Sequence, residues 1–502
     1  MSLALWLCAA LAAPAPAAAR PCSAHLLAFD NDGRPLDASA LAAFIGRGDG
    51  AIPALWGLAP DGTILSRPKL SQDKQGIALS WDGPPRLILS LPWPLPAEGF
   101  STLLVDRGGR GIADGETIRL NEELALTQYR LFKEARLRHE ASGCKPGRQA
   151  LRLAQAARDA VARADAGENP PERARLFGRS LSATSQAWRA LQVDCGRQRA
   201  RSKAGGALRL GLTLDGSMVD RIRQYRWIVK EVRRSGANWA RLVFRLNPGD
   251  FAYERQASFN EYDAIVRALD DSGLRVMGCV LDSTQWPAGL TPELYSRRAL
   301  DLVRHYKGRI GSWELGSELN GDWLGGRGQA LPARRVYDIV SAASAQVKEL
   351  DPKIEVVDTL YWWEGASPDA EHSLQGWLAN YVPLGFGKNV DVVALSLWPR
   401  DSPVGMSLER AFAILARALP GKPLMLGSLG YSDGPAPGYW WGDAESAPAR
   451  ADLLAWLTPA SCGLERCLGG VFWSQALEQM LPDSGRPTPL YRAWRKAVRD
   501  LR

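Results

Sequence analysis

Apolar runs and helical repeats alternate regularly in the second half of the chain. Strand-like apolar runs begin near Leu208, Asn238, Leu274, Ile310, Ile354, Val390, Pro423 and Gly469. Between them, apolar residues recur at helical spacing over residues 218–234, 259–271, 292–306, 333–350, 408–419 and 447–457. Eight strands that alternate with helices over roughly 295 residues are typical of a (β/α)8 barrel. A doubly wound sheet also alternates in this way, but no glycine-rich phosphate loop follows the first strand, so the pattern favours the barrel at residues 207–502.

Residues 21–120 have a different pattern, with short apolar or alternating runs separated by turn sequences such as Asp-Gly and Gly-Pro-Pro. Strands at this spacing predict a small β-sandwich. Trp56, Trp81 and Trp93 could stack on a sugar, although core packing is the more frequent role for such residues.

Residues 121–206 are rich in Ala, Leu, Arg and Glu, with apolar residues at helical spacing. Gly143 and the sequence Asn169-Pro170-Pro171 divide this segment, which predicts a helical hairpin or a three-helix bundle. Residues 196–207, rich in Arg, Gly and Ser, indicate a linker. Two cysteine pairs are disulfide candidates: Cys144 with Cys195, and Cys462 with Cys467.

The composition of the 502 residues, with 46% hydrophobic and 23% charged residues, is that of a globular protein of more than one domain. The net charge is +8, and residues 121–206 alone carry 17 Lys and Arg against 9 Asp and Glu. A basic helical surface could bind an anionic polymer or lipid, but it is more often a solvated face, and we expect no nucleic-acid partner. With four His and no Cys/His cluster at ligand spacing, we expect no metal and no cofactor.

Residues 1–20 contain an apolar stretch followed by an Ala- and Pro-rich sequence. This pattern predicts a secretory signal cleaved near Ala17 to Ala19, and hence a secreted or periplasmic protein. No later run reaches the roughly 18 apolar residues that a membrane span requires.

The fourth predicted strand ends in Trp313-Glu314-Leu315-Gly316-Ser317-Glu318-Leu319-Asn320. This sequence resembles the fourth-strand motif of the clan A glycoside hydrolases, Trp-Glu-x-x-Asn-Glu-x-Asn. The resemblance implies a retaining β-glycosidase barrel in which Glu318 is the catalytic acid/base. Ser317 stands where the family has the Asn that binds the sugar 2-hydroxyl, so this contact is expected to be weaker.

The seventh predicted strand, Pro423 to Tyr431, resembles the family's nucleophile strand, but Ser428 occupies the position of the nucleophilic Glu. A serine hydroxyl carries no negative charge to stabilise an oxocarbenium-like transition state, and it needs an adjacent base to act as a nucleophile. Hydrolysis is therefore expected to be impaired.

Other strand ends carry residues that the resemblance implies in sugar binding. Arg241 is similar to the second-strand Arg that supports the nucleophile, Trp398 to the sixth-strand aromatic, and Trp473 to the eighth-strand Trp that floors the reacting subsite. The predicted substrate-binding residues are Arg241, Asp282, Trp286, Ser317, Asn320, Trp323, Trp362, Trp398, Tyr431 and Trp473.

Three functions fit these features. The first is hydrolysis of a β-linked polysaccharide or oligosaccharide, in which another acid serves as the base of an inverting reaction or replaces the nucleophile. The candidate acids are Asp282, Asp358, Glu364, Asp433 and Asp443. The second function is polysaccharide binding without turnover, and the third is a purely structural role for the barrel as a platform.

Overall fold

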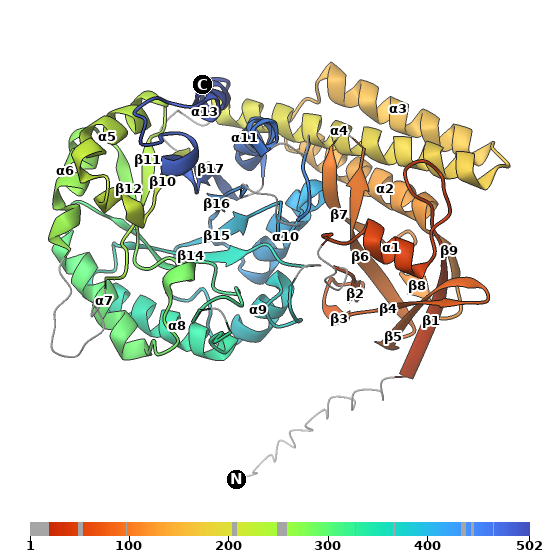
Figure 1. Cartoon of the computed structure of the whole chain (residues 1–502), viewed down its shortest axis with the longest axis horizontal. Coiled ribbons are helices and arrows are strands. Elements are labelled where there is room, and N and C mark those ends of the chain that lie inside the picture. Colours follow the sequence, from red (N-terminus) through yellow and green to blue (C-terminus); the bar gives the residue numbers. More distant parts are fainter. Residues whose placement is uncertain are drawn as a thin grey trace, which may run out of the picture.

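The computed structural model describes residues 20–48, 54–96, 98–202, 208–247, 259–326, 328–364, 367–432, 438–442, 446–464 and 466–501. Its C-terminal part is a closed barrel of parallel strands, as predicted (Figure 1). The strands are β10 (Arg209–Leu214), β11 (Trp239–Val243), β12 (Arg275–Cys279), β13 (Ser312–Gly316), β14 (Glu355–Tyr361), β15 (Val392–Leu397), β16 (Leu424–Leu429) and β17 (Cys467–Trp473). Each begins within two residues of the predicted apolar run.

Helices cover the outside of this barrel. They are α5 (Tyr225–Arg234), α6 (Asp263–Asp271), α7 (Pro292–His305), α8 (Ala333–Leu350), α9 (Leu374–Tyr381), α10 (Leu408–Ala418), α11 (Ser446–Gly463), α12 (Ala476–Gln479) and α13 (Pro489–Arg499). Thr291 caps α7 through a hydrogen bond to Leu294 N, and Pro292 occupies its first turn, so this helix begins where the sequence pattern predicts. The repeat predicted at 218–234 becomes helical only at Tyr225, after two 3-10 turns.

Side chains on the strands alternate between the barrel interior and the helical layer. One small core inside the barrel takes side chains from most of the strands: Trp239, Met277, Val357, Val392, Ala394, Met425 and Phe472. Their neighbours along the strands, including Ala240 and Leu426, belong to the larger core beneath the helices. This alternation decides which of the predicted site residues can face the barrel mouth.

The N-terminal part contains two sheets, with strand orders β4-β5-β1-β9 and β3-β2-β6-β7, and β8 pairs with β6. The elements are β1 (Arg20–Leu27), α1 (Ala38–Phe44), β2 (Trp56–Leu58), β3 (Ile64–Ser66), β4 (Lys69–Asp73), β5 (Gly76–Gly83), β6 (Arg86–Leu95), β7 (Gly99–Val105), β8 (Ile112–Ala113) and β9 (Thr117–Arg119). Both sheets contribute to one core, which includes Trp81 and Trp93. Trp56 is also buried, beneath the guanidinium of Arg67. All three tryptophans are therefore packing residues.

Three helices follow the sheets: α2 (Leu120–Ala141), α3 (Arg148–Asp165) and α4 (Pro170–Ser202). A disulfide joins Cys144, after α2, to Cys195 in α4. The predicted linker is wrong for residues 196–202, which continue α4. Gly196 is required there because α11 approaches closely: an added Cβ would lie 1.8 Å from the backbone oxygen of Pro459.

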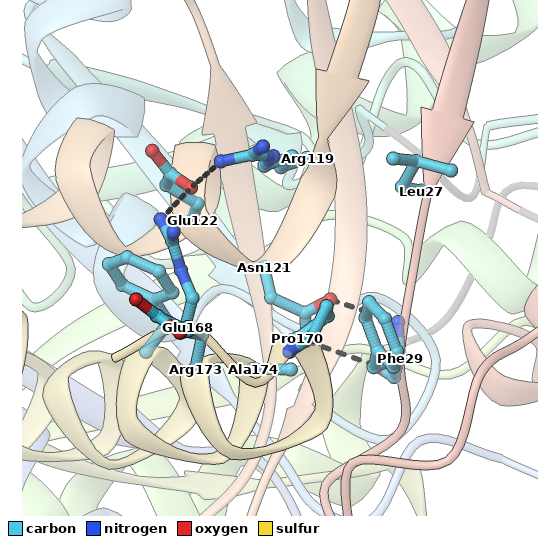
Figure 2. Close-up of a pocket in the computed structure, with 10 residues that line it drawn as sticks. Leu27, Phe29, Arg119, Asn121, Glu122, Glu168, Pro170, Arg173 and Ala174 are labelled. Carbon is cyan, nitrogen blue, oxygen red and sulfur yellow. Dashed lines mark hydrogen bonds and ion pairs between the residues drawn. The ribbon is translucent and has the colours of Figure 1, made fainter. Parts of the chain in front are cut away.

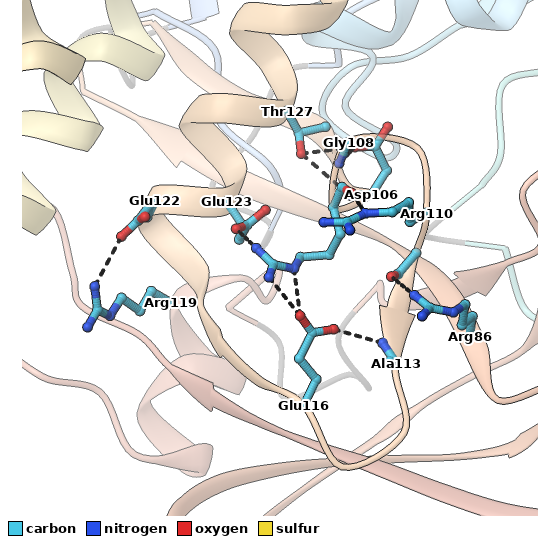
Figure 3. Close-up of polar contacts among 12 residues, drawn as sticks. Arg86, Asp106, Gly108, Arg110, Ala113, Glu116, Arg119, Glu122, Glu123 and Thr127 are labelled. Carbon is cyan, nitrogen blue, oxygen red and sulfur yellow. Dashed lines mark hydrogen bonds and ion pairs between the residues drawn. The ribbon is translucent and has the colours of Figure 1, made fainter. Parts of the chain in front are cut away.

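The start of α2 is fixed to the sheets by ion pairs and hydrogen bonds (Figure 3). Arg107 Nε donates to Glu116 Oε1 at 2.8 Å, and the same guanidinium contacts Glu123 of α2. Thr127 Oγ1 donates to Asp106 Oδ1 at 3.2 Å. Because the sheets and α2–α4 also share one core, residues 21–202 pack as a continuous unit, and the domain boundary near residue 120 stays a prediction.

Where α4 begins, it leaves a cleft of about 320 Å³ against β1 and α2 (Figure 2). Its apolar lining includes Leu27, Phe29 and Phe177, and Glu122 and Arg173, which form an ion pair of 3.1 Å, also line it. All of its lining residues belong to the N-terminal part, so this cleft is separate from the strand ends of the barrel.

The N-terminal part contacts the barrel through β7 and α4. Met406 N donates to Ser101 Oγ at 2.7 Å, and Ser407 Oγ donates to Thr102 O at 2.7 Å. Figure 1 shows α4 running from the sheets to the helical layer of the barrel at α11. Across the described ranges, no helix is both long and apolar enough to cross a membrane.

Candidate functional site

Glu318 lies just beyond β13, at the carboxyl end of the barrel strands. Its carboxylate accepts hydrogen bonds from Ser283 Oγ at 2.7 Å, Ser396 Oγ at 2.6 Å and Trp398 Nε1 at 3.2 Å. These donors follow or end β12 and β15, so closure of the barrel assembles the site. Glu318 has a φ of +51°, a backbone conformation that is uncommon outside glycine and that is often found at functional sites.

The environment of Glu318 favours its protonated form. Burial raises the pKa of Glu318 and the negative charge of Asp282 raises it further, whereas hydrogen bonds from Ser396 and Ser283 and the charge of Arg241 lower it. The net shift is upward, so the carboxyl group keeps its proton to a higher pH than an exposed glutamate does. A carboxyl group of this kind suits general acid catalysis.

Arg241 has a carboxylate partner although position 428 provides none. Arg241 Nε donates to Glu314 Oε2 at 2.6 Å, and Glu314 also accepts from Thr359 Oγ1. Arg241 Nη2 lies 3.3 Å from Ser317 Oγ and 3.7 Å from Asp282 Oδ2. The sequence motif contained Glu314, but its role as the partner of Arg241 was not predicted.

Ser428 lies on β16 beside Ser396, its partner in the parallel register of β15 and β16. Residues paired in this way point to the same side of the sheet, so Ser428 faces the side on which Ser396 binds Glu318. The oxygen of Ser428 lies 2.6 Å from that of Ser474, and the two share a hydrogen bond. At the seventh-strand position the site therefore presents two neutral hydroxyl groups.

Two of the predicted aromatic residues keep partly exposed rings near the strand ends. Trp398 contacts Glu318 through its indole nitrogen, and its ring lies over Gly430, where an added Cβ would be 2.3 Å away. Trp323 packs edge-on against Tyr361 and Trp363, at 5.0 and 5.1 Å between ring centres. Both rings can contact a sugar.

Trp473 does not floor the site. Its neighbour Phe472 packs inside the barrel against Trp239, so Trp473 points to the helical layer. There it is 0% exposed and donates its indole N–H to Gln479 Oε1 at 3.2 Å. The resemblance implied that Trp473 floors the reacting subsite, but the ring points away from the barrel interior because side chains alternate along a strand.

Three further predicted contacts are also buried. Trp286 packs against Tyr295 of α7, Trp362 donates to Pro403 O at 3.4 Å, and the Tyr431 hydroxyl accepts from Trp441 N at 3.3 Å. All three side chains are at most 2% exposed. They stabilise the loops around the site and present no surface to a ligand.

Asn320 joins two loops and is 0% exposed. Its side-chain oxygen accepts from Tyr361 N at 2.6 Å, and its nitrogen donates to Tyr361 O at 3.0 Å and His372 O at 2.8 Å. This use of the amide leaves Asn320 a positioning role beside Glu318 rather than the predicted contact with substrate.

The structure describes three of the five candidate acids. Glu364 is buried against Arg410, Ser90 and Gln375, away from Glu318. Asp358 is also buried, on the face of β14 opposite Thr359, which reaches Glu314 inside the barrel. Asp433 and Asp443 lie outside the described residues.

Among the candidate acids that the structure describes, Asp282 is the one whose charge acts on Glu318. Its side chain is 27% exposed, and its Oδ1 accepts from Thr284 N at 3.1 Å. It lines a cleft of about 540 Å³ at the carboxyl ends of β10, β11 and β12, together with Asp215, Asp220, Arg245 and Gln285. The next residue, Ser283, donates to Glu318, so the cleft adjoins the candidate proton donor.

Among the described residues, no group of three or more His, Cys, Asp or Glu side chains is arranged to hold a metal ion. The chemistry that this arrangement offers is proton transfer by Glu318, with Asp282 as the neighbouring carboxylate.

No protein-family model matches the chain, and no curated protein matches it. Solved structures of glycoside hydrolases do match. A fungal beta-1,4-galactanase has a TM-score of 0.46 and 16% identity, over 58% of this chain and 99% of that chain. The catalytic domain of the GH53 enzyme of Ignisphaera aggregans has a TM-score of 0.41 and 16% identity, over 58% of this chain and 97% of that domain. Xylanase 10B from Thermotoga petrophila has a TM-score of 0.41 and 15% identity, over 60% of this chain and 96% of that chain.

Proposed function

We propose that this protein is a carbohydrate-active protein of glycoside hydrolase type that acts on a β-linked polysaccharide or oligosaccharide. The observation that carries the proposal is the environment of Glu318, which is buried, held by three hydrogen-bond donors and placed beside an acid-lined cleft at the barrel mouth. A carboxyl group with a raised pKa next to a second carboxylate is the arrangement that glycoside hydrolysis requires.

In this reaction Glu318 donates its proton to the glycosidic oxygen as the bond to the anomeric carbon breaks. Asp282 accepts a proton from a water molecule, whose oxygen forms the new bond to the anomeric carbon. The configuration at that carbon is then inverted, since water attacks directly and no glycosyl-enzyme intermediate forms.

Binding without efficient turnover is the second candidate function. It is favoured by the Ser428–Ser474 pair, which places hydroxyl groups where the resemblance implies a nucleophilic carboxylate. Loss of that carboxylate typically removes on the order of 4–8 kcal/mol of transition-state stabilisation. In this case Trp323, Trp398 and the acid-lined cleft would hold a glycan chain that is not cut.

The two functions are separated by measuring both cleavage and binding. Wild-type protein is incubated with β-1,4-linked galactan, xylan, mannan and glucan, and reducing ends and bound polysaccharide are quantified. For a hydrolase, Glu318→Gln and Asp282→Asn each lower cleavage by about 100-fold or more, and the first product has the inverted anomeric configuration. Binding that persists in wild type without any cleavage supports the second function. If the protein neither binds nor cleaves any of the four glycans, both proposed functions are wrong.

We also propose that the protein acts in a secreted or periplasmic location. The Cys144–Cys195 disulfide supports an oxidising compartment. The predicted signal, apart from Arg20, and the predicted cleavage site lie outside the described residues. A pairing of Cys462 with Cys467, both buried, stays a prediction. Fractionation of cells that express the full chain, with the N-terminal sequence of the product, tests the location.

A further inference from the structure

A second polar cleft, of about 410 Å³, lies between α4 and α11, outside the barrel. Glu98, in the turn between β6 and β7, lines it together with Gln186 and Arg189 of α4 and Ala455 of α11. It shares no lining residue with the acid-lined cleft beside Glu318. Nothing in the function proposed above uses this cleft.

Glu98 is the unusual residue in this cleft. It is 4% exposed, and its Oε1 accepts from Gln186 Nε2 at 3.2 Å. Its Oε2 is buried and has no hydrogen-bond partner among the residues that the structure describes, although Ser185 also hydrogen-bonds the carboxyl group, and burial raises the pKa of Glu98 to about 7. Leaving a buried acceptor without a donor typically costs about 1–3 kcal/mol, so such an atom indicates a missing partner.

Arg189 provides a fixed donor in the same cleft. Its guanidinium lies 5.0 Å from the ring of Trp441 and 5.2 Å from that of Trp456, and these two rings stack on each other. Its Nη2 donates to Asp452 Oδ2 at 2.6 Å. Its Nε is buried and, within the described ranges, has no acceptor. The cation–π contacts and the ion pair hold the guanidinium rigidly.

An unpaired acceptor and an unpaired donor that line one cleft select a ligand that can both donate and accept. A hydroxyl group does both, and neighbouring hydroxyl groups on a sugar ring can serve a carboxylate and a guanidinium together. Asp452 and Asp194 disfavour an anion, and Arg189 and Arg197 disfavour a cation. These charges leave a neutral, hydroxyl-rich ligand as the best match.

We propose that the cleft between α4 and α11 binds a neutral sugar unit, as a second glycan-binding site apart from Glu318. The site itself does not depend on catalysis, although the choice of β-linked sugars as ligands rests on the proposed function. Two sites on one chain would hold a long glycan more tightly than either site alone, since the second contact becomes intramolecular.

The test uses the full chain and four probes: the β-1,4-linked tetrasaccharides of glucose, xylose, mannose and galactose. Ala455→Trp places a large ring at an exposed lining position of α11. Ala156→Trp, at an exposed position of α3 outside the cleft, is the matched control. Binding is measured by calorimetry and by saturation-transfer NMR.

We expect at least one tetrasaccharide to bind about tenfold or more weakly to Ala455→Trp, with the control within about twofold of wild type. Glu98→Gln, which preserves the size of the side chain, should weaken the same sugar without filling the cleft. Equal affinities for wild type and both cleft variants, or no binding by any of the four sugars, would overturn the proposal.

Glu318→Gln separates this site from the proposed function. If the protein does not act on glycans at Glu318, binding that is sensitive to Ala455→Trp should persist unchanged in that variant. If only the second site is wrong, cleavage or binding that depends on Glu318 remains while Ala455→Trp has no effect.

Discussion

Glu314 Oε2 lies 2.6 Å from Arg241 Nε, and the side chains of both residues are at most 4% exposed. The resemblance to clan A glycoside hydrolases implies that this Arg supports a nucleophilic carboxylate at the seventh strand. Here Glu314 neutralises its charge from the fourth strand. Ser428 therefore leaves no buried cation without a partner, which explains how the barrel can carry serine at that position.

Glu314→Gln should destabilise the fold strongly. The substitution keeps the size of the side chain but leaves the buried guanidinium of Arg241 without its closest negative charge. Removing one member of a buried ion pair typically costs about 3–5 kcal/mol. The free energy of unfolding in urea provides the measurement, and Glu349→Gln, at an exposed position on α8, is the control that should change it by less than about 0.5 kcal/mol. Equal values for the two variants would show that the pair contributes nothing to stability.

Asp358→Asn should become more stable relative to wild type as the pH rises. Burial, and after it the charge of Glu314, raise the pKa of Asp358 to about 7, against a hydrogen bond from Gly316 N that lowers it. In the unfolded chain this carboxyl titrates near pH 4, so between about pH 4 and 7 the native state binds more protons, and wild-type stability falls as pH rises through this range. Asparagine does not titrate and avoids this loss.

The measurement is the difference in unfolding free energy between Asp358→Asn and wild type at pH 4 and at pH 8. We expect this difference to shift in favour of the variant by on the order of 4 kcal/mol. Asp82→Asn, at an exposed position on β5, should show no such shift. A constant difference for Asp358→Asn would mean that its carboxyl titrates alike in the folded and unfolded chains.

The barrel could be predicted from the sequence because its signal is long and repetitive. Each of the eight strands begins within two residues of the start of its predicted apolar run, and the helix predicted at 333–350 matches α8. The position of Glu318 at the end of a strand could be predicted because its motif ends an apolar run. The orientation of the Trp473 ring could not be predicted, since a displacement of one residue along the strand turns a side chain from the interior to the helical layer. The partner of Arg241 was missed because Glu314 is distant in sequence and meets Arg241 only when the barrel closes.

Glu409→Ala should loosen the helices α2 and α4 from the barrel. Glu409, in α10, contacts His139 Nε2 of α2 at 3.0 Å and accepts from Trp188 Nε1 and Gln192 Nε2 of α4 at 2.9 and 3.0 Å. The substitution leaves these polar groups without their acceptor, at a cost of about 1–3 kcal/mol for each that stays buried.

Amide hydrogen exchange, followed by mass spectrometry, checks this effect along the chain. We expect faster exchange in α2 and α4 and unchanged exchange in β13–β16. Arg334→Ala removes an exposed pair within α8 and is the control. If exchange rises equally in the barrel strands, the helices and the barrel unfold together, and the contacts of Glu409 do not hold the helices independently.

Ser428→Glu should raise hydrolysis if the site has lost only its nucleophile. Ser428 pairs with Ser396, whose hydroxyl binds Glu318, so a carboxylate at position 428 would enter the same site as Glu318, the candidate proton donor. A restored nucleophile forms a glycosyl-enzyme bond that water then hydrolyses, which predicts retention of configuration instead of inversion. We expect release of dinitrophenol from activated β-glycosides to increase by about 100-fold or more.

Ser428→Gln is the matched control, because it has the size of glutamate without the charge and should give no increase. Azide provides an independent check in the wild-type protein. As a small anion it can take the place of the missing carboxylate, attack the anomeric carbon and displace dinitrophenolate, which leaves a glycosyl azide of inverted configuration. Acceleration by azide together with activity of Ser428→Glu would show that the missing negative charge alone limits turnover. If neither occurs while the chain still binds glycans, binding without turnover is the function that the site supports.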